Sequence, residues 1–332
     1  MSKVKPRVMT VKPHRAVDWN EQAIRDVIQL RGFVLAGIKV DGMRCHVLKI
    51  DGEVHFLTRA GIEIPALAPY KAHFEQQWLA TYALADNLVL DCEVWLPHVS
   101  FEKGCGILRR DAPVAPGLVQ FVVLDIISQA QLQGLPVDVS ASYVGRHAAI
   151  VGRFNAVLGS AEYAKQHMHL IVSEALAKIE DVADIARVYG VARSLGFEGL
   201  VIKDPALHPR NGKVSGMWKV KPGCGADFAP GWEGDGKIVG YVWGDGEKAN
   251  AGKIVGFRVA LEDGTEVNAT GLTQAQMEDY TSDVECGSQA GALAFIGRYA
   301  EVTAMEKTVS GSLRHPSFRR FRDLDSAPGV KA

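Results

Sequence analysis

Short apolar runs bounded by turn residues recur along the chain of 332 residues. Runs of about four to eight residues that are rich in Val, Ile, Phe and Trp are typical of strands. In the N-terminal two-thirds of the chain they predict strands over 33–39, 45–50, 53–58, 88–95, 121–127, 197–205 and 218–221. Asp51-Gly52, between the second and third of these runs, predicts a tight hairpin turn.

Apolar residues at helical spacing predict helices between these strands. The helices are expected over 19–30, 70–84, 143–158 and 181–195. Gly159 and Gly196 follow the last two of them, and a glycine commonly ends a helix. Residues 65–69 and 205–216 are expected to be loops, because they are rich in proline or in polar residues.

The composition shifts to glycine, proline and acid around Gly223–Asp235, which predicts a boundary between a domain 1–228 and a domain 229–332. Beyond the boundary we expect short strands over 237–243, 253–261, 266–269 and 299–305, with one helix over 273–280. Short strands with a single helix in about a hundred residues suit a small barrel of the OB type. The predicted fold class is therefore α+β.

Composition restricts the classes of protein that the chain can be. It is 47% hydrophobic and 23% charged, which is enough to bury the cores of two domains. No apolar stretch has the length of a membrane span or of a signal peptide, so we expect a soluble, intracellular protein. The cysteines are odd in number, scattered and without C-x-x-C spacing, which argues against disulfides and zinc.

Basic residues gather in three segments, although the net charge of the chain is only −1. The segments are 1–17, 203–221 and 307–322. One such segment alone is usually a solvated face. Three of them in a nearly neutral chain indicate a basic track for phosphates.

A single lysine, Lys39, lies where one predicted strand ends and Asp41-Gly42 begins a turn. Gly42 would let backbone approach a ligand closely, and the amine would project into a cleft as a candidate nucleophile. The alternative is a solvated turn between two strands, for which Lys next to Asp-Gly is equally typical.

Other charged residues fall in pairs on single strand faces, because residues two apart point the same way. Asp91 and Glu93 form one such pair, and Lys219 and Lys221 form another. Like charges repel, so each pair needs a metal, a basic partner or an anion nearby. No P-loop and no G-x-G-x-x-G is present, so a nucleotide would have to be held in another way.

A lysine that attacks a phosphate must be a free amine. Neighbouring cations favour that form and also stabilise charge on the phosphate oxygens. Lys219, Lys221 and a divalent ion held by Glu198 would supply such a field.

Six segments together resemble, in order and spacing, the successive motifs of ATP-dependent DNA ligases. They are Lys39–Arg44, Thr58–Gly61, Asp91–Glu93, Phe121–Asp125, Glu198–Lys203 and Trp218–Lys221. The runs at 198–205 and 311–318 resemble the small bacteriophage-type enzymes of this family. The resemblance covers nearly the whole chain and implies a nucleotidyltransferase domain of ATP-grasp-like type, with antiparallel sheets and flanking helices, followed by an OB-fold barrel.

The resemblance also implies an activity. The enzyme would seal nicks in double-stranded DNA during replication, repair and recombination, through a lysyl-adenylate and a DNA-adenylate. It would use ATP and a divalent metal, Mg²⁺, and act as a monomer in the cytoplasm, that of the host cell if a phage encodes it.

The resemblance assigns roles to individual residues. Lys39 would be the nucleophile, Glu93 would contact ribose, Phe121 would stack on adenine, and Glu198 with Glu93 would serve the metal. The remaining nucleotide contacts would come from Ile38, Arg44, Arg59, Lys203, Lys219 and Lys221. Arg59 and the barrel residues Arg314, Arg319, Arg320 and Arg322 would contact pyrophosphate or DNA.

The chain departs from the family pattern at three places. Cys92 stands where glycine is usual, and Gly37 stands where many members have an acid that reads the adenine amino group. The closing motif ends Arg322-Asp323-Leu324-Asp325, so which arginine meets pyrophosphate stays open. Two other functions share these features: a capping guanylyltransferase or RNA ligase, and a non-catalytic DNA-binding protein.

Overall fold

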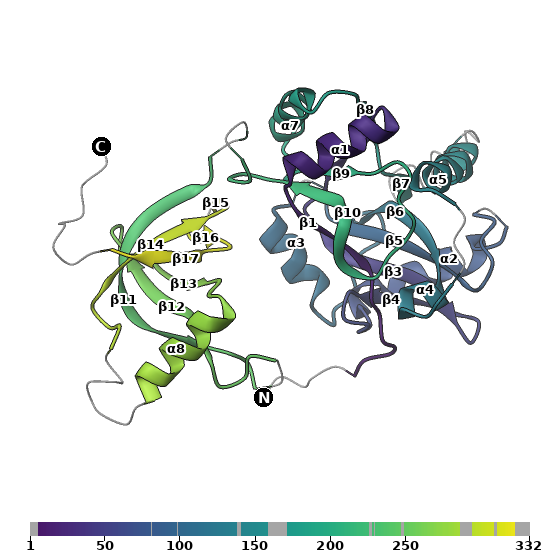
Figure 1. Ribbon diagram of the computed structural model, residues 1–332. Coiled ribbons are helices and arrows are strands. Elements are labelled where there is room, and N and C mark those ends of the chain that lie inside the picture. Colours follow the sequence, from purple (N-terminus) through teal and green to yellow (C-terminus); the bar gives the residue numbers. More distant parts are fainter. Residues whose placement is uncertain are drawn as a thin grey trace. The chain divides into compact units, whose positions relative to one another are not determined.

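The computed structural model divides the chain into two compact units, Met1–Val220 and Lys221–Ala332 (Figure 1). The described residues are 6–80, 82–97, 99–137, 141–158, 171–225, 228, 230–246, 249–285, 294–308 and 311–322, with backbone only for 154–158 and 171–173. The boundary predicted after residue 228 falls inside the second unit.

The first unit contains two five-stranded sheets. Sheet A runs in the order β1 (His14–Asp18), β10 (Gly212–Val220), β9 (Gly199–Lys203), β2 (Val34–Lys39) and β8 (Leu176–Ile179). Sheet B runs in the order β4 (Glu53–Thr58), β3 (Met43–Ile50), β5 (Leu88–Trp95), β6 (Gln120–Ser128) and β7 (Ile171–Ser173). Most neighbouring strands are antiparallel, as predicted; β1 with β10 and β6 with β7 are parallel.

Strands that neighbour their partners in sequence lie where they were predicted. The hairpin of β3 and β4 turns at Asp51 and Gly52, whose φ angles of 51° and 86° are both positive. Positive φ at both central residues is the requirement of a type I′ turn, which matches the twist of a hairpin.

The prediction was wrong for some strands with distant partners, although β2 and β9, which pair across about 160 residues, lie where they were predicted. β10 begins at Gly212, inside the predicted loop 205–216, because it pairs with β1 at the N-terminal end of the unit. β1, β7 and β8 were not predicted at all. Each is short, and pairing with a distant strand supplies the backbone hydrogen bonds that hold it in place.

Helices cover the sheets of the first unit. α1 (Glu21–Arg31) and α7 (Ala183–Ser194) pack against β2 and β9 of sheet A, and α5 (Tyr143–Leu158) packs against β6 of sheet B (Figure 1). Asn20 caps α1 by accepting from the backbone N–H of Ala23 at 3.0 Å.

Four segments of the first unit differ from the predicted helices and loops. The expected loop 65–69 is a 3₁₀ helix, Pro65–Tyr70, and the expected helix 70–84 is shortened to α2 (Lys71–Gln77). Proline at the start of the 3₁₀ helix presets the backbone φ angle that a helix needs. Two short helices, α3 (Phe101–Leu108) and α4 (Gln129–Gln133), were not predicted.

The main core of the first unit lies on one face of sheet B. It is built from alternate residues of β3 to β6 and from side chains of the 3₁₀ helix and α2. Phe56, Phe74 and Phe121 meet there with ring centroids 5.1–5.8 Å apart. Alternation therefore sends the polar residues of these strands to the opposite face, the one that carries the candidate site.

The second unit is a closed barrel with the strand order β11-β12-β13-β17-β14. The strands are β11 (Trp232–Trp243), β12 (Ile254–Leu261), β13 (Glu266–Thr270), β14 (Tyr299–Ala304) and β17 (Ser317–Phe321). α8 (Gln274–Glu285) packs on β12, and β15 (Glu306–Lys307) with β16 (Leu313–Arg314) form a small separate hairpin. The unit is the OB-type barrel that was predicted, with β11 starting earlier than expected. β17, which closes the barrel between β13 and β14, and the hairpin of β15 and β16 were not predicted.

Candidate active site

Lys39 ends β2, and its ammonium group contacts the carboxylate of Glu198. Strand pairing brings the two together, because Lys39 lies opposite Gly199, and the Glu198 N–H donates to the Lys39 carbonyl at 3.2 Å. The side chain of Lys39 is 24% exposed and that of Glu198 only 7%. An ammonium nitrogen has no lone pair for attack, so reaction requires Lys39 to lose a proton.

Lys219 projects from β10 in the same sheet. It lies opposite Val201, which in turn lies opposite Gly37, two residues before Lys39. The Lys219 Nζ is 3.0 Å from Asp18 Oδ1, and Lys213 holds the other oxygen of that carboxylate at 2.9 Å. Hydrogen bonds from Lys213 and Lys219 lower the pKa of Asp18 to about 2.

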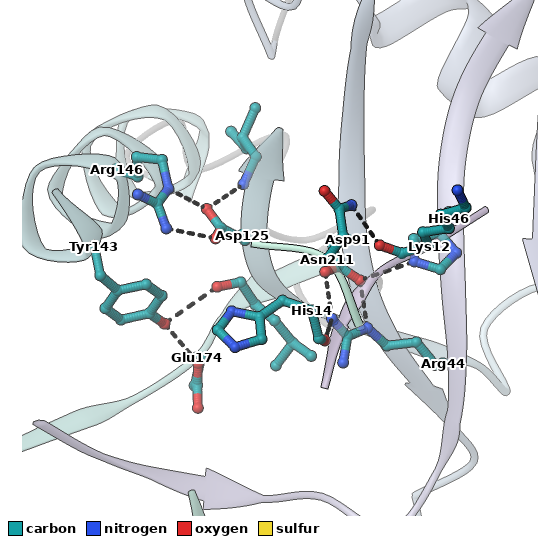
Figure 2. Close-up of polar contacts among 12 residues, drawn as sticks. Lys12, His14, Arg44, His46, Asp91, Asp125, Tyr143, Arg146, Glu174 and Asn211 are labelled. Atoms are coloured by element: carbon teal, nitrogen blue, oxygen red, sulfur yellow. Dashed lines mark hydrogen bonds and ion pairs between the residues drawn. The ribbon is translucent and has the colours of Figure 1, made fainter. Parts of the chain in front are cut away.

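Arg44 of β3 and Asp91 of β5 lie on one face of sheet B, and the Arg44 Nη2 lies 3.5 Å from the carbonyl oxygen of His14 in sheet A (Figure 2). The Arg44 guanidinium donates from Nε and Nη2 to the two oxygens of Asp91. Burial opposes ionisation of Asp91, but the charges of Arg44, His46 and Lys203 together with the hydrogen bonds from Arg44 outweigh it and hold the pKa of Asp91 below its ordinary value. His46 Nε2 lies 3.4 Å from the same carboxylate. Burial lowers the pKa of His46, which favours the neutral ring.

Glu93 lies near charged side chains of both sheets. Burial raises the pKa of Glu93 to about 7; the charges of Arg44 and Lys39 oppose the rise, and those of Asp91 and Glu198 add to it. Gly42 explains the close approach of the strands, since a Cβ there would lie 2.5 Å from the Val94 carbonyl oxygen. The glycine predicted to admit a ligand thus admits the backbone of β5.

Lys203 is buried in a polar cluster with Glu174 and Tyr143. Its Nζ contacts the Glu174 carboxylate and donates to the Tyr143 hydroxyl at 2.7 Å. Tyr143 in turn donates to Glu174 at 3.0 Å (Figure 2). Burial raises the pKa of the Tyr143 hydroxyl well above its ordinary value. Lys203 is therefore held by protein groups, and a contact with a nucleotide would pass through this cluster.

The donors available to a metal ion are the carboxylates of Glu93 and Glu198. Within the described part of the chain, no three His, Cys, Asp or Glu side chains gather to form a metal site. Mg²⁺ is commonly held by one or two carboxylates together with substrate phosphates. The pair therefore fits a magnesium ion that arrives with a nucleotide, and does not fit a metal held by protein ligands alone.

Comparison with models of protein families identifies the family of this chain. A model of the ATP-dependent DNA ligase domain matches residues 20–221, well over half of the chain. The chain belongs to the ATP-dependent DNA ligases. A model of the DNA ligase C-terminal domain matches residues 230–322, which contain the barrel of this ligase.

Phage enzymes resemble this ligase over nearly their whole length, which confirms the predicted small bacteriophage type. It is 30% identical to the DNA ligase of Enterobacteria phage T3, over 98% of this chain and 99% of that protein. It is 29% identical to the DNA ligase of Escherichia phage T7, over 98% and 100%. The structure of the bacteriophage T7 ATP-dependent DNA ligase in complex with ATP is 28% identical and superposes with a TM-score of 0.55, covering 94% of this chain and 98% of that one.

The family assignment excludes the two other functions that the sequence left open. Neither a capping guanylyltransferase or RNA ligase nor a non-catalytic DNA-binding protein is retained, because the matched family consists of DNA-joining enzymes. No helix among the described residues of this ligase is long and apolar enough to cross a membrane.

The position of Phe121 contradicts its predicted role. Its side chain is fully buried in the core of sheet B, against Tyr70 and Phe74, on the face opposite Asp91 and Glu93. No face of the ring is left for a base, so stacking on adenine is not proposed again. Cys92 points into the same core, so its side chain does not face the site.

Other predicted residues are spread over the ligase. Ile38 points away from the face that carries Lys39, since successive side chains alternate, and Arg59 is exposed at the end of β4. Lys221 begins the second unit. In the barrel, Arg314 pairs with Glu306 at 3.2 Å, Arg320 with Glu301 at 2.7 Å and Arg322 with Asp235 at 2.9 Å, and Arg319 is exposed.

Sequence reasoning missed Asp18, Tyr143 and Glu174. Asp18 meets Lys219 only because β1 joins sheet A beside β10. Glu174 meets Lys203 because the chain passes from sheet B to sheet A between β7 and β8. Tyr143 was assigned only to the start of a helix. The lack of a side chain at Gly37 was the one available signal, because it predicts that another group fills the space.

Proposed function

We propose that this ligase seals nicks in duplex DNA by three successive displacements that begin at Lys39. The contact between Lys39 and Glu198, on the sheet face that carries Lys219 and near Glu93 of sheet B, is the observation that supports it. A reactive amine, cations for phosphate and carboxylates for a metal are then within one site.

In the first displacement the Lys39 Nζ, having lost a proton, bonds to the α-phosphorus of ATP, and the bond to the bridging oxygen of the β-phosphate breaks. Pyrophosphate leaves with that electron pair. In the second, an oxygen of the 5′-phosphate at the nick attacks the same phosphorus and Nζ leaves. In the third, the 3′-hydroxyl loses its proton and attacks the 5′-phosphorus, and AMP leaves.

The residues of the chain align and stabilise these steps. Lys219 moves from Asp18 to the α-phosphate, and Glu93 contacts ribose. Arg44, held flat by Asp91, faces phosphate. Glu198 and Glu93, together with nucleotide phosphates, would hold a Mg²⁺ ion, which would supply positive charge to neutralise the phosphates.

We extend the proposal to DNA. Arg59, Lys221 and the barrel arginines contact phosphates of the nicked duplex or pyrophosphate. Arg319 is the first residue to test in the barrel, because Arg314, Arg320 and Arg322 each pair with an acid. We further propose that the ligase acts as a monomer in the cytoplasm, in replication, repair and recombination.

Mass spectrometry of the intact protein after exposure to ATP and Mg²⁺ tests the proposal. The wild type should gain one AMP on Lys39. Lys39→Arg should gain none, because a guanidinium keeps the positive charge beside Glu198 but is not deprotonated. Lys49→Ala, which removes a lysine paired with Asp86 at 3.1 Å, is the matched control and should gain AMP.

Two results would contradict the proposal. One is a wild-type protein that never gains the mass of AMP, and the other is a Lys39→Arg protein that still seals nicks. Labelled GTP offered in place of ATP should leave the protein unlabelled.

A further inference from the structure

Glu174 is fixed at the point where the chain passes from sheet B to sheet A. Its backbone N–H donates to the Val123 carbonyl at 3.1 Å, and its own carbonyl oxygen lies 2.8 Å from His147 Nε2. Its side chain is only 2% exposed. Because both backbone groups of Glu174 are hydrogen-bonded and its side chain is buried, the carboxylate has a defined position.

The carboxylate fills the space that Gly37 leaves open. A Cβ at Gly37 would lie 1.8 Å from Glu174 Oε1, so no side chain fits there while the carboxylate is in place. Gly37 and Lys39 lie two residues apart on β2, on the same face and about 7 Å apart. Glu174 therefore reaches the face from which Lys39 attacks.

The two oxygens of this carboxylate differ in their hydrogen bonds. Lys203 Nζ and the Tyr143 hydroxyl both donate to Oε2. Among the described residues, no hydrogen bond is recorded to Oε1, the oxygen that lies over Gly37. A carboxylate oxygen has two lone pairs, so Oε1 keeps its capacity to accept from a ligand.

The charges on this face set the direction in which a nucleotide would lie. Lys219, the cation suited to phosphate, lies on β10, at the β1 side of the sheet. Glu174 lies over Gly37 on β2, which is separated from β10 by β9, and Lys203 ends β9. With the α-phosphate between Lys39 and Lys219, the nucleoside would extend toward Gly37, and its base would meet the polar groups there.

We propose that Glu174 selects adenine, with Oε1 accepting a hydrogen bond from the exocyclic amino group of the base. The inference rests on the proposed function of Lys39. Adenine presents a donor at its amino group, whereas guanine presents the acceptor O6 at the same position. An ionised carboxylate can only accept hydrogen bonds. The guanine O6 is also an acceptor, so it would face Oε1 without a hydrogen bond in a site removed from water.

Lys203 and Tyr143 are positioning residues in this arrangement. Their hydrogen bonds occupy Oε2, and the Lys203 ammonium compensates the buried negative charge. This gives Lys203 a role behind the carboxylate, in place of the direct nucleotide contact that was predicted from the sequence.

The rate at which the intact protein gains a nucleotide tests the proposal, with three triphosphates compared below saturation. ATP carries the amino group, inosine triphosphate carries O6, and purine riboside triphosphate carries hydrogen. The wild type should prefer ATP to each of the others by about tenfold or more, because a buried acceptor is left unpaired by both. Glu174→Gln can donate to O6, so its preference for ATP over inosine triphosphate should fall by about tenfold or more.

Asp125→Asn supplies the control for a purely structural effect. Asp125 forms the neighbouring buried ion pair with Arg146, with Nε–Oδ1 at 2.9 Å (Figure 2). Its loss should lower stability and leave the ratio of ATP to inosine triphosphate at the wild-type value.

The outcomes separate this inference from the proposed function. Equal losses for ATP and inosine triphosphate in Glu174→Gln would make Glu174 a structural residue only, and overturn the inference. If Glu174→Gln does not fold, the wild-type comparison decides alone, since equal rates with ATP and purine riboside triphosphate would also overturn it. A wild type that gains no AMP from ATP would instead refute the role of Lys39.

Discussion

The guanidinium of Arg44 lies against the carboxylate of Asp91, and both are carried by neighbouring strands of sheet B. The side chain of Asp91 is 6% exposed, so the pair is largely removed from water. Two hydrogen bonds hold the guanidinium plane in one orientation, which a single charge contact would not do. Arg44 is thereby presented to the site as a fixed group.

Removing one partner of this pair should be costly. Asp91→Ala leaves Arg44 buried without its carboxylate, and we expect the free energy of unfolding to fall by about 3–5 kcal/mol. Urea denaturation measures the change. Asp86→Ala, which removes the 71% exposed partner of Lys49, is the control and should change stability by less than about 0.5 kcal/mol. Equal effects of the two substitutions would contradict the importance of burial.

Phe121 should matter for stability and not for nucleotide binding. Phe121→Ala opens a cavity among Phe56, Tyr70 and Phe74, and we expect a loss of about 3–5 kcal/mol. The milder Phe121→Leu should leave KM for ATP in adenylylation unchanged, because the ring does not face the site. A several-fold rise of KM in a stably folded Phe121→Leu protein would restore the stacking role.

The stability of the ligase should depend on pH through Glu93. Its pKa is raised from 4.5 to about 7 in the folded protein, chiefly by burial. The folded state therefore binds the proton more tightly than the unfolded state between these values, so this contribution to stability falls as pH rises through that range and is constant above it. Glu93→Gln cannot titrate, so the wild type should lose stability relative to it as pH rises. Parallel curves in urea denaturation from about pH 5 to about pH 8 would contradict the raised pKa.

Lys219 and Lys213 form a matched pair for testing the phosphate role. Both contact Asp18, at 3.0 and 2.9 Å, so either substitution to alanine removes one partner of the same exposed carboxylate. Lys219→Ala should slow single-turnover adenylylation by roughly a hundredfold, because it removes a cation from the transferred phosphate. Lys213→Ala should change the rate by less than about threefold, since an exposed ion pair contributes little. Equal rates for the two variants would count against Lys219.

Local pattern predicted the elements whose partners are near in sequence. The hairpin of β3 and β4 follows from alternating apolar residues around Asp51-Gly52, and β5 and α5 begin and end at the expected residues. The pattern also predicted the barrel, because each of its early strands pairs with the next along the chain. Most of these interactions are encoded within a few tens of residues.

The role of Phe121 shows where the pattern failed. Its place in a strand was correctly predicted, but a family motif does not say which of two faces a side chain takes. Packing decided it, since the aromatic residues of α2 and the 3₁₀ helix form the core on that face.

The sequence by itself determined that this chain is a DNA ligase with a lysine at the end of a strand, because the short motifs can be recognised by their order without knowledge of their contacts. The tertiary structure alone decided the partners of those motifs. Asp18 reaches Lys219 and Glu174 reaches Lys203 across stretches of chain that carry no common pattern. Charges meet there because sheet pairing places distant strands side by side, and pairing depends on backbone hydrogen bonds that no side-chain pattern records.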